Sequence, residues 1–326
     1  MTTDEHNPSS RRERARIASV IEWAEHELSA IPTVDRPPGQ EASNPLGQSP
    51  SNGRYPLDAS EDTLAYHQWL RRRGEPTLLP PPRRTPRTRR PRFRIPLISA
   101  ITYAPEGSDA SLAQSAGSVL DQRIGNWELI VADNGRDVVR AAVLSSLIQT
   151  DRRVRSVGAG DSREAALNAA IETAQGEFVV VLGVRDALAS DCFSEFAEAL
   201  LDNDDVDVVY ADEDCIDQEG ERSAPILKPS WSPDLLLSTD YLGRALCYRR
   251  SLVESLDGFR PGFGVAAEHD LALRVTEKAR RIVHVSRIAY HRRSDGTPHH
   301  RLSAGPGSAR AVADALKRRG EPSAII

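Results

Sequence analysis

After Pro96 the chain alternates between short apolar strands and helical segments, and this alternation restricts the fold more than any other feature. The expected strands are residues 97–102, 127–132, 154–157, 178–182 and 206–210, and helices are expected at residues 108–120, 137–149 and 161–174. Strands separated by helices of this length predict right-handed crossovers. We therefore expect an α/β domain whose mostly parallel central sheet is covered by helices on both faces.

Ligands of such sheets bind beyond the carboxyl ends of the strands. Four loops follow strands in this sequence, at residues 103–108, 133–136, 183–187 and 211–217. Beyond residue 226 the pattern is less regular, with a helix expected near residues 268–281 and a strand near residues 281–290. The four loops and this second part should hold the functional side chains.

Residues 1–95 differ from the rest in being poor in hydrophobic residues and rich in Pro, Arg, Ser and Asn. We expect an N-terminal extension that is largely disordered, with short helices at residues 11–30 and 62–73. The arginine-rich segment from Pro80 to Arg94 should be extended, either as a charged linker, which we favour, or as an attachment to an anionic membrane surface. The folded domain is expected at residues 96–295, followed by a tail with one helix at residues 309–319.

Composition excludes several classes of function. The formal net charge of -5 argues against a protein built to bind nucleic acid, and three cysteines are too few for a disulfide framework or a zinc site. The sequence contains neither a long apolar run nor the pattern of a signal peptide. A cytoplasmic protein is expected, at most peripheral to the inner face of a membrane.

Several segments, in matching order, resemble the family 2 glycosyltransferases, in particular the glycosyltransferase domains of bacterial O-antigen and cell-wall polysaccharide enzymes. They include LISAITYAPE, NWELIVADNG, ALNAAIETAQGEFVVVL, VDVVYADEDCID, KPSWSPDLLLSTDYLG and EHDLALRV. The resemblance covers about residues 97–293. It implies a GT-A fold, a nucleotide-sugar donor, and transfer of a sugar to a hydroxyl of a glycan or lipid-linked acceptor, with a partner glycosyltransferase possible.

The resemblance also implies roles for two acids in EHDLALR. Glu268 stands where the family has the base that takes the proton of the acceptor hydroxyl, and Asp270 would be its helper or a cap. A carboxylate at a helix N-terminus could equally serve only to stabilise the helix dipole. We favour the base.

The family's Asp-x-Asp metal motif is replaced in this sequence. Where relatives have these two aspartates, the chain has Gly183 and Arg185, followed by Asp186. The family usually uses Mg²⁺ or Mn²⁺, but the ligands are largely absent, so no metal cofactor is expected. Two interpretations are open: Arg185 binds the diphosphate in place of the cation, or the domain has lost donor binding, Arg185 pairs with Asp186, and the fold serves as a binding or scaffold subunit.

The remaining candidates come from the same resemblance. The donor or nucleotide contacts would be Tyr103, Glu106, Asp133, Arg185 and Asp186, the acceptor-side residues would be Asp212, Asp214, Lys228, Trp231 and Asp234, and His291 would contact the diphosphate. Each also has a structural interpretation. Trp231 could stack on a sugar or fill the core, the acidic cluster could cap a turn, and a lone histidine is more often a packed or surface residue.

Overall fold

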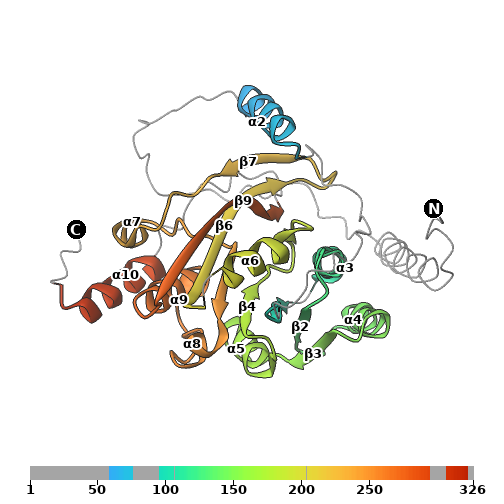
Figure 1. Cartoon of the computed structure of the whole chain (residues 1–326). Coiled ribbons are helices and arrows are strands. Elements are labelled where there is room, and N and C mark those ends of the chain that lie inside the picture. The colour runs from blue at the N-terminus through green and yellow to red at the C-terminus, as the bar shows by residue number, and fades with distance from the viewer. Residues whose placement is uncertain (1–58, 76–94, 106, 203, 294–305, 322–326) are drawn as a thin grey trace, which may run out of the picture. The chain divides into compact units, whose positions relative to one another are not determined.

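The computed structural model describes residues 59–75, 95–105, 107–202, 204–293 and 306–321. The chain divides into two compact units, Met1–Glu75 and Pro76–Ile326. The described part of the first unit contains helix α2 (Ala59–Arg73), which was predicted at residues 62–73. The second unit carries the sheet (Figure 1). The helix predicted at residues 11–30, the segment from Pro80 to Arg94 and the domain boundary after residue 295 lie outside the described residues; the boundary after residue 95 stays a prediction.

The first half of the sheet is parallel. Its strands follow the order β3 (Val154–Gly158), β2 (Trp127–Asp133), β1 (Ile98–Ala104) and β4 (Phe178–Val181). Helices α3 (Asp109–Leu120), α4 (Val138–Thr150) and α5 (Arg163–Thr173) connect them. Ile101 of β1 lies opposite Ile130 on β2 and Val181 on β4. The predicted alternation of strands and helices is confirmed in this half.

The second half of the sheet is mixed. Strand β8 (Leu246–Arg249) is antiparallel to both β4 and β6 (Val206–Ile216), and β9 (Arg281–Arg293) is parallel to β6. The short strands β5 (Ala187–Leu188) and β7 (Arg222–Ile226) pair antiparallel with β9 and β6. The helices of this half are α6 (Cys192–Leu201), α7 (Pro233–Ser238), α8 (Arg250–Glu254) and α9 (Ala267–Thr276), with the 3₁₀ turn η1 (Gly264–Ala266) before α9.

One edge of the sheet collects the parts of the chain that matter for function. Since β8 runs opposite to both β4 and β6, the carboxyl ends of β1, β2, β4, β6 and β9 all lie at this edge. The turn that precedes β8 lies there too. Helices α5 and α9 run antiparallel to the strands that they lead into, so their N-terminal ends also reach this edge. The topology thus gathers loops that are distant in sequence.

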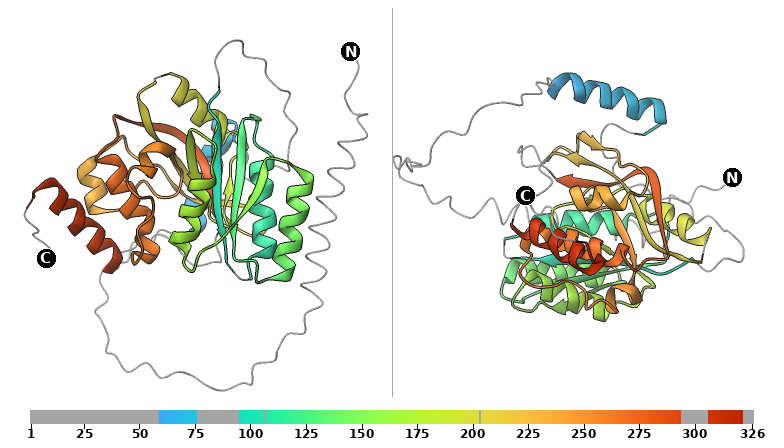
Figure 2. Two further views of the ribbon diagram at one scale, coloured as in Figure 1. Left: turned by 90° about the horizontal axis from the view of Figure 1, so that it is seen from below. Right: turned by 90° about the vertical axis from the view of Figure 1, so that its left-hand side faces the viewer.

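Helices cover both faces of the sheet (Figure 2), and an apolar core lies on each face. Alternating strand residues face opposite sides: Leu129 and Val131 belong to the core with α3, α4 and α6, whereas Ile130 belongs to the core with α5, α8 and α9. Helix α10 (Pro306–Arg319), predicted at residues 309–319, packs on α9 with Ala311 and Ala315 buried (Figure 1). None of the described helices combines the length and apolarity needed to cross a bilayer.

Two predicted boundaries were wrong. Residues 211–217 were expected to be a loop, but β6 continues to Ile216 and buries the acidic run at residues 212–214. The reason is tertiary: cationic side chains from elsewhere in the fold pair with these acids, which a local pattern of three carboxylates does not indicate. The helix expected at residues 268–281 ends at Thr276, because the chain turns there to enter β9.

Gly258 tests how tightly the loop before α9 is fixed. Its φ is +60°, and a Cβ there would lie 2.3 Å from Oδ1 of Asn168, which itself accepts a hydrogen bond from the Phe259 N–H. Gly135 also has a positive φ, +68°, but a Cβ there would have no neighbour within 4 Å. The Gly135→Ala substitution therefore measures the backbone strain without a steric clash. We expect Gly258→Ala to lower the free energy of unfolding by about 2–4 kcal/mol and Gly135→Ala by about 1 kcal/mol, measured by urea denaturation. Equal losses would show that Asn168 moves aside freely.

Candidate functional site

The loop between β4 and β5, residues 182–186 and here called the β4 loop, is closed by hydrogen bonds. The Tyr290 hydroxyl accepts from the Gly183 N–H at 2.9 Å and donates to Oδ2 of Asp186 at 2.7 Å. The Arg293 N–H donates to the other oxygen of Asp186 at 3.1 Å. A Cβ at Gly183 would lie 2.3 Å from Asp186 Oδ2, so the loop in this form accepts only glycine at that position.

The side chains at the β4 loop do not fit a divalent cation. Gly183 and Arg185 offer no carboxylate, and both oxygens of Asp186 already accept hydrogen bonds. Across the described ranges, no group of three or more His, Cys, Asp or Glu side chains is arranged to hold a metal.

Arg185 does not pair with Asp186, contrary to one of the two interpretations of this loop. Its side chain is exposed, and within the described part of the chain its guanidinium has no hydrogen bond or ion pair. Only its backbone carbonyl is engaged, as an acceptor from Arg293 Nε at 3.1 Å. Asp186 is held instead by Tyr290 and the Arg293 backbone.

Glu268 lies in the first turn of α9 and is clamped between two arginines. It is 8% exposed, and its Oε1 accepts hydrogen bonds from Arg244 at 3.0 Å and from Arg163, the first residue of α5. Burial acts to raise the pKa of Glu268, but Arg244 and Arg163 outweigh it and hold the pKa below its usual value. Glu268 is therefore a partly buried carboxylate that is ionised at neutral pH.

Arg244 connects Glu268 with the β4 loop. It follows Gly243, whose φ is +61° and where a Cβ would lie 2.7 Å from Oε2 of Glu213. The Arg244 N–H donates to the same oxygen at 2.9 Å, so this tight turn fixes the start of the side chain. Burial opposes the charge of Arg244, yet the nearby Glu268, Asp186 and Glu213 carboxylates raise its pKa overall. The sequence did not single out Arg244. The preceding Gly243 is the one sequence feature that could have indicated it.

Asp240 is a second residue that the sequence did not single out. Its Oδ1 is buried without a hydrogen-bond partner among the residues described, as is Nδ1 of His269. Burial raises the pKa of Asp240, His269 acts to lower it, and the charges of Glu268 and Glu213 raise it further. A carboxyl with a raised pKa thus lies near the ionised Glu268.

Two of the predicted acceptor-side residues are joined in a buried network. Asp212 accepts from His284 Nε2 at 2.8 Å and from the Lys228 N–H at 2.9 Å. The Lys228 ammonium, 1% exposed, lies 3.3 Å from Glu213 Oε2 and donates to the Leu242 carbonyl at 2.5 Å. Burial lowers the pKa of Lys228. These side chains stabilise the β6 end of the sheet edge and are not open to solvent.

Asp214 and His291 face each other across β6 and β9. Asp214 accepts from His291 Nδ1 at 2.5 Å and from Arg222 Nε at 2.6 Å, and all three side chains are buried. The carboxylate fixes the orientation of the imidazole, because the ring nitrogen facing it must carry the proton. Ala187, directly after the β4 loop, pairs with His291 in the sheet, so His291 lies next to that loop.

The other predicted contacts come from several elements. Asp133, at the end of β2, accepts from Nε of the buried Arg140 at 2.6 Å. Tyr103 and Trp231 are half-buried and pack against the core on the α5 and α9 face. Asp234 is exposed on α7. Glu106 lies outside the described residues.

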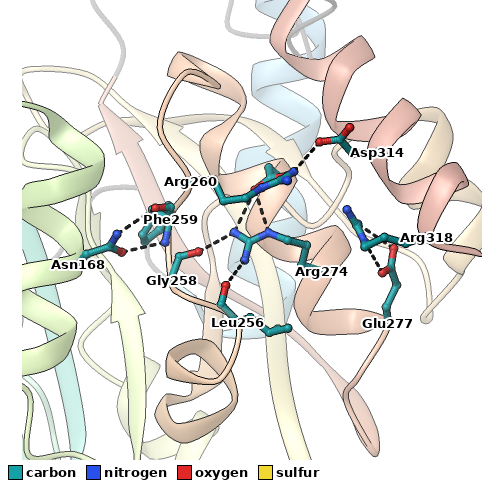
Figure 3. A network of polar contacts seen from close by, with 10 residues as sticks. Asn168, Leu256, Gly258, Phe259, Arg260, Arg274, Glu277, Asp314 and Arg318 are labelled. Atoms are coloured by element: carbon teal, nitrogen blue, oxygen red, sulfur yellow. Dashed lines mark hydrogen bonds and ion pairs between the residues drawn. The ribbon is translucent and has the colours of Figure 1, made fainter.

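Asp270 is fully buried in an ion-pair network behind Glu268. It accepts from Arg274 Nε at 2.9 Å and from Arg260, and Arg260 also pairs with Asp314 of α10 at 2.9 Å. Arg274 donates to the carbonyls of Leu256 and Gly258 (Figure 3). These contacts hold α9 against the preceding loop and α10, and they position the helix that carries Glu268.

Comparison with known sequences identifies relatives of the chain. A family model described as Glycosyl transferase family 2 matches residues 106–253. The O-antigen biosynthesis protein RfbC of Myxococcus xanthus is 35% identical over 241 residues, which are 71% of this chain and 19% of that protein. Protein y4gI of Sinorhizobium fredii is 33% identical over 200 residues, 60% of this chain and 22% of that protein. The chain spans about a fifth of the length of these relatives.

Comparison with solved structures identifies the fold. S. aureus TarS 1-349 in complex with UDP is similar with a TM-score of 0.54 and 16% identity, over 68% of this chain and 65% of that chain. The complex of the same protein with UDP-GlcNAc gives the same TM-score and identity over 68% and 66% of the two chains. The GT-A fold expected from the sequence is confirmed.

Tyr290 tests whether the closed β4 loop stabilises the fold. We expect Tyr290→Phe to lower the free energy of unfolding by about 1–3 kcal/mol, because the Gly183 N–H and the Asp186 carboxylate lose a buried partner. Tyr248 is the matched control: its buried hydroxyl has no partner within the described ranges, so Tyr248→Phe should be neutral or slightly stabilising. Thermal unfolding of the two variants distinguishes them. Equal effects would mean that the hydroxyl of Tyr290 contributes nothing to the loop.

Proposed function

Because the chain contains a glycosyl transferase family 2 domain, we propose that it transfers a sugar from a nucleotide-sugar donor to a hydroxyl of a polysaccharide or glycolipid acceptor. The observation that carries the proposal is Glu268, an ionised and partly buried carboxylate at the sheet edge where ligands of α/β proteins bind. A carboxylate that keeps its charge at neutral pH is suited to accept a proton.

In the proposed reaction Glu268 takes the proton of the acceptor hydroxyl while the hydroxyl oxygen attacks the anomeric carbon of the donor. The new glycosidic bond forms as the bond between that carbon and the diphosphate oxygen breaks. The nucleoside diphosphate leaves with the electron pair and gains negative charge, which the site must stabilise. Asp270 has a positioning role, since its contacts hold α9 in place.

We further propose that this stabilisation does not need a metal. The β4 loop offers no suitable carboxylates, whereas Arg163 and Arg244 provide guanidinium groups beside Glu268 at the same edge. A guanidinium presents paired N–H donors that match two phosphate oxygens. One interpretation of the sequence assigned this contact to Arg185, whereas Arg163 and Arg244 already lie beside Glu268.

The relatives support the class of donor and acceptor. The Myxococcus xanthus relative is named for O-antigen biosynthesis, and the similar TarS structures contain UDP or UDP-GlcNAc. A nucleotide diphosphate-sugar donor, transfer of a hexose and a glycan acceptor are consistent with both. Of the remaining partner predictions, the anionic membrane surface concerns residues 80–94, which lie outside the described residues, and a second glycosyltransferase stays a prediction.

A second candidate function is a catalytically silent domain that serves as a binding or scaffold subunit of a polysaccharide-synthesis complex. The closed β4 loop favours it: Asp186 is used internally, and Gly183 has no room for a side chain. In this case Glu268 and its two arginines would only join α5, α9 and the turn before β8.

Donor binding separates the two functions. Calorimetry with a panel of nucleotide sugars, in Mn²⁺ and in EDTA, should detect binding with the same affinity in both conditions, because side chains supply the positive charge. Affinity that requires Mn²⁺ would contradict metal independence. No binding of any nucleotide sugar at millimolar concentration would favour the silent domain.

Glu268→Gln tests the base directly. We expect the transfer rate to fall by about 10²-fold or more, because the amide cannot accept the proton, while donor binding is not weakened. Glu277→Gln, at the other end of α9, removes a surface ion pair with Arg318 and should leave transfer unchanged. Retained turnover in Glu268→Gln would exclude Glu268 as the base.

The same role predicts a pH dependence. The pKa of Glu268 is held below the ordinary glutamate value of 4.5, so the base loses its charge only as the pH falls through that lowered value. The acid limb of the rate profile of the free enzyme should therefore lie below pH 4.5. Arg163→Gln removes one cation from Glu268 and should move this limb to higher pH.

A further inference from the structure

We propose that Arg244, and not Arg185, binds the diphosphate of the donor in place of the family's divalent cation, and that this binding couples the donor to Glu268. The inference rests on the proposed function, since it needs a donor that carries a diphosphate. It concerns a residue that lies 59 positions after Arg185 in the sequence, and that the fold brings to the β4 loop.

The position of Arg244 carries the argument. Its guanidinium donates to Glu268 and interacts electrostatically with Asp186 of the β4 loop and with Tyr290, which closes that loop. It thus lies between the base and the loop where the family holds its metal. The side chain is 29% exposed, so its remaining N–H donors can reach a ligand at the sheet edge.

Arg244 is also better fixed than Arg185. Its backbone is held by Gly243 and by the hydrogen bond to Glu213, whereas the Arg185 side chain has no contact of this kind among the described residues. Arg293 already donates to the carbonyls of Arg185 and Asp217. A cation that is held in place before the ligand arrives loses less conformational entropy on binding.

The ion pairs that Glu268 makes with Arg163 and Arg244 provide the coupling between donor binding and the base. Glu268 is the anion that pairs with Arg244 and Arg163 in the structure. A diphosphate at Arg244 brings additional negative charge and shares the guanidinium donors. Glu268 is then less stabilised as a carboxylate, and its affinity for a proton rises. Donor binding would thereby make Glu268 a stronger base, so that the acceptor hydroxyl is activated only when a donor is present.

Nucleotide affinity tests the assignment. Calorimetry in EDTA with UDP, GDP, ADP, CDP and dTDP identifies a nucleotide that the wild-type protein binds, and that nucleotide is then measured with variants. We expect Arg244→Gln to lose affinity by about tenfold or more and the matched control Arg185→Gln by less than about twofold. An Arg244→Gln variant that binds within twofold of wild type overturns the inference and leaves the proposed function intact. A wild-type protein that binds none of the five overturns both.

Arg244→Lys separates a binding effect from a folding effect. It keeps the charge beside Glu268 but lacks the paired donors of a guanidinium. With a thermal unfolding midpoint close to wild type, it should still lose affinity several-fold. Affinity equal to wild type in Arg244→Lys would show that the paired N–H donors of the guanidinium do not bind the phosphates. It would overturn the assignment of these donors to the diphosphate.

Proton uptake tests the coupling without a turnover assay. Binding of the same nucleotide is measured by calorimetry at about pH 5 in two buffers of different ionisation enthalpy, which gives the number of protons taken up. Wild type should take up more protons than Glu268→Gln, because only wild type has the Glu268 carboxylate, whose pKa rises on binding. At about pH 8 the two proteins should not differ. Identical uptake in both proteins at the lower pH would overturn the coupling.

Discussion

The pairing of buried charges at one edge of the sheet is the constraint on which the rest of this structure depends. Glu268 enters that edge from α9 and is held by Arg163 from α5 and Arg244 from the turn before β8. A carboxylate that is 8% exposed would be strongly disfavoured without such partners. The two ion pairs that keep Glu268 ionised also hold α5, α9 and the turn before β8 together. The same contacts therefore determine both the charge and the geometry of the site.

The β4 loop is closed by contacts among the protein's own side chains. Gly183 leaves room for Asp186 to turn inward, and the hydroxyl of Tyr290 closes the loop between them. An aspartate in place of Gly183 would meet Asp186 Oδ2 before it could reach a cation. The loop is thus an internally satisfied turn, and the positive charges at this edge are carried by arginines that come from other elements.

Much of the fold followed from local patterns, and much of the site did not. The strands up to residue 181 and the helices α3 to α5 agree with apolar periodicity, because these elements are governed by which face is buried. The acidic run Asp212, Glu213 and Asp214 was assigned to a loop, yet it is buried in β6, since His284, Lys228 and Arg222 lie opposite the carboxylates. Asp270, placed beside the base by its motif, holds α9 through Arg260 and Arg274.

By itself the sequence determined the alternation of strands and helices, the resemblance of its segments to one family of transferases, and the presence of Gly183 and Arg185 after β4. These depend on the order of residues along the chain. Only the tertiary structure decided which arginines face Glu268, because Arg163 and Arg244 are 105 and 24 residues from it in sequence. No periodicity or spacing encodes such a contact; it arises where β8 reverses within the sheet and brings the Gly243–Arg244 turn between α9 and the β4 loop.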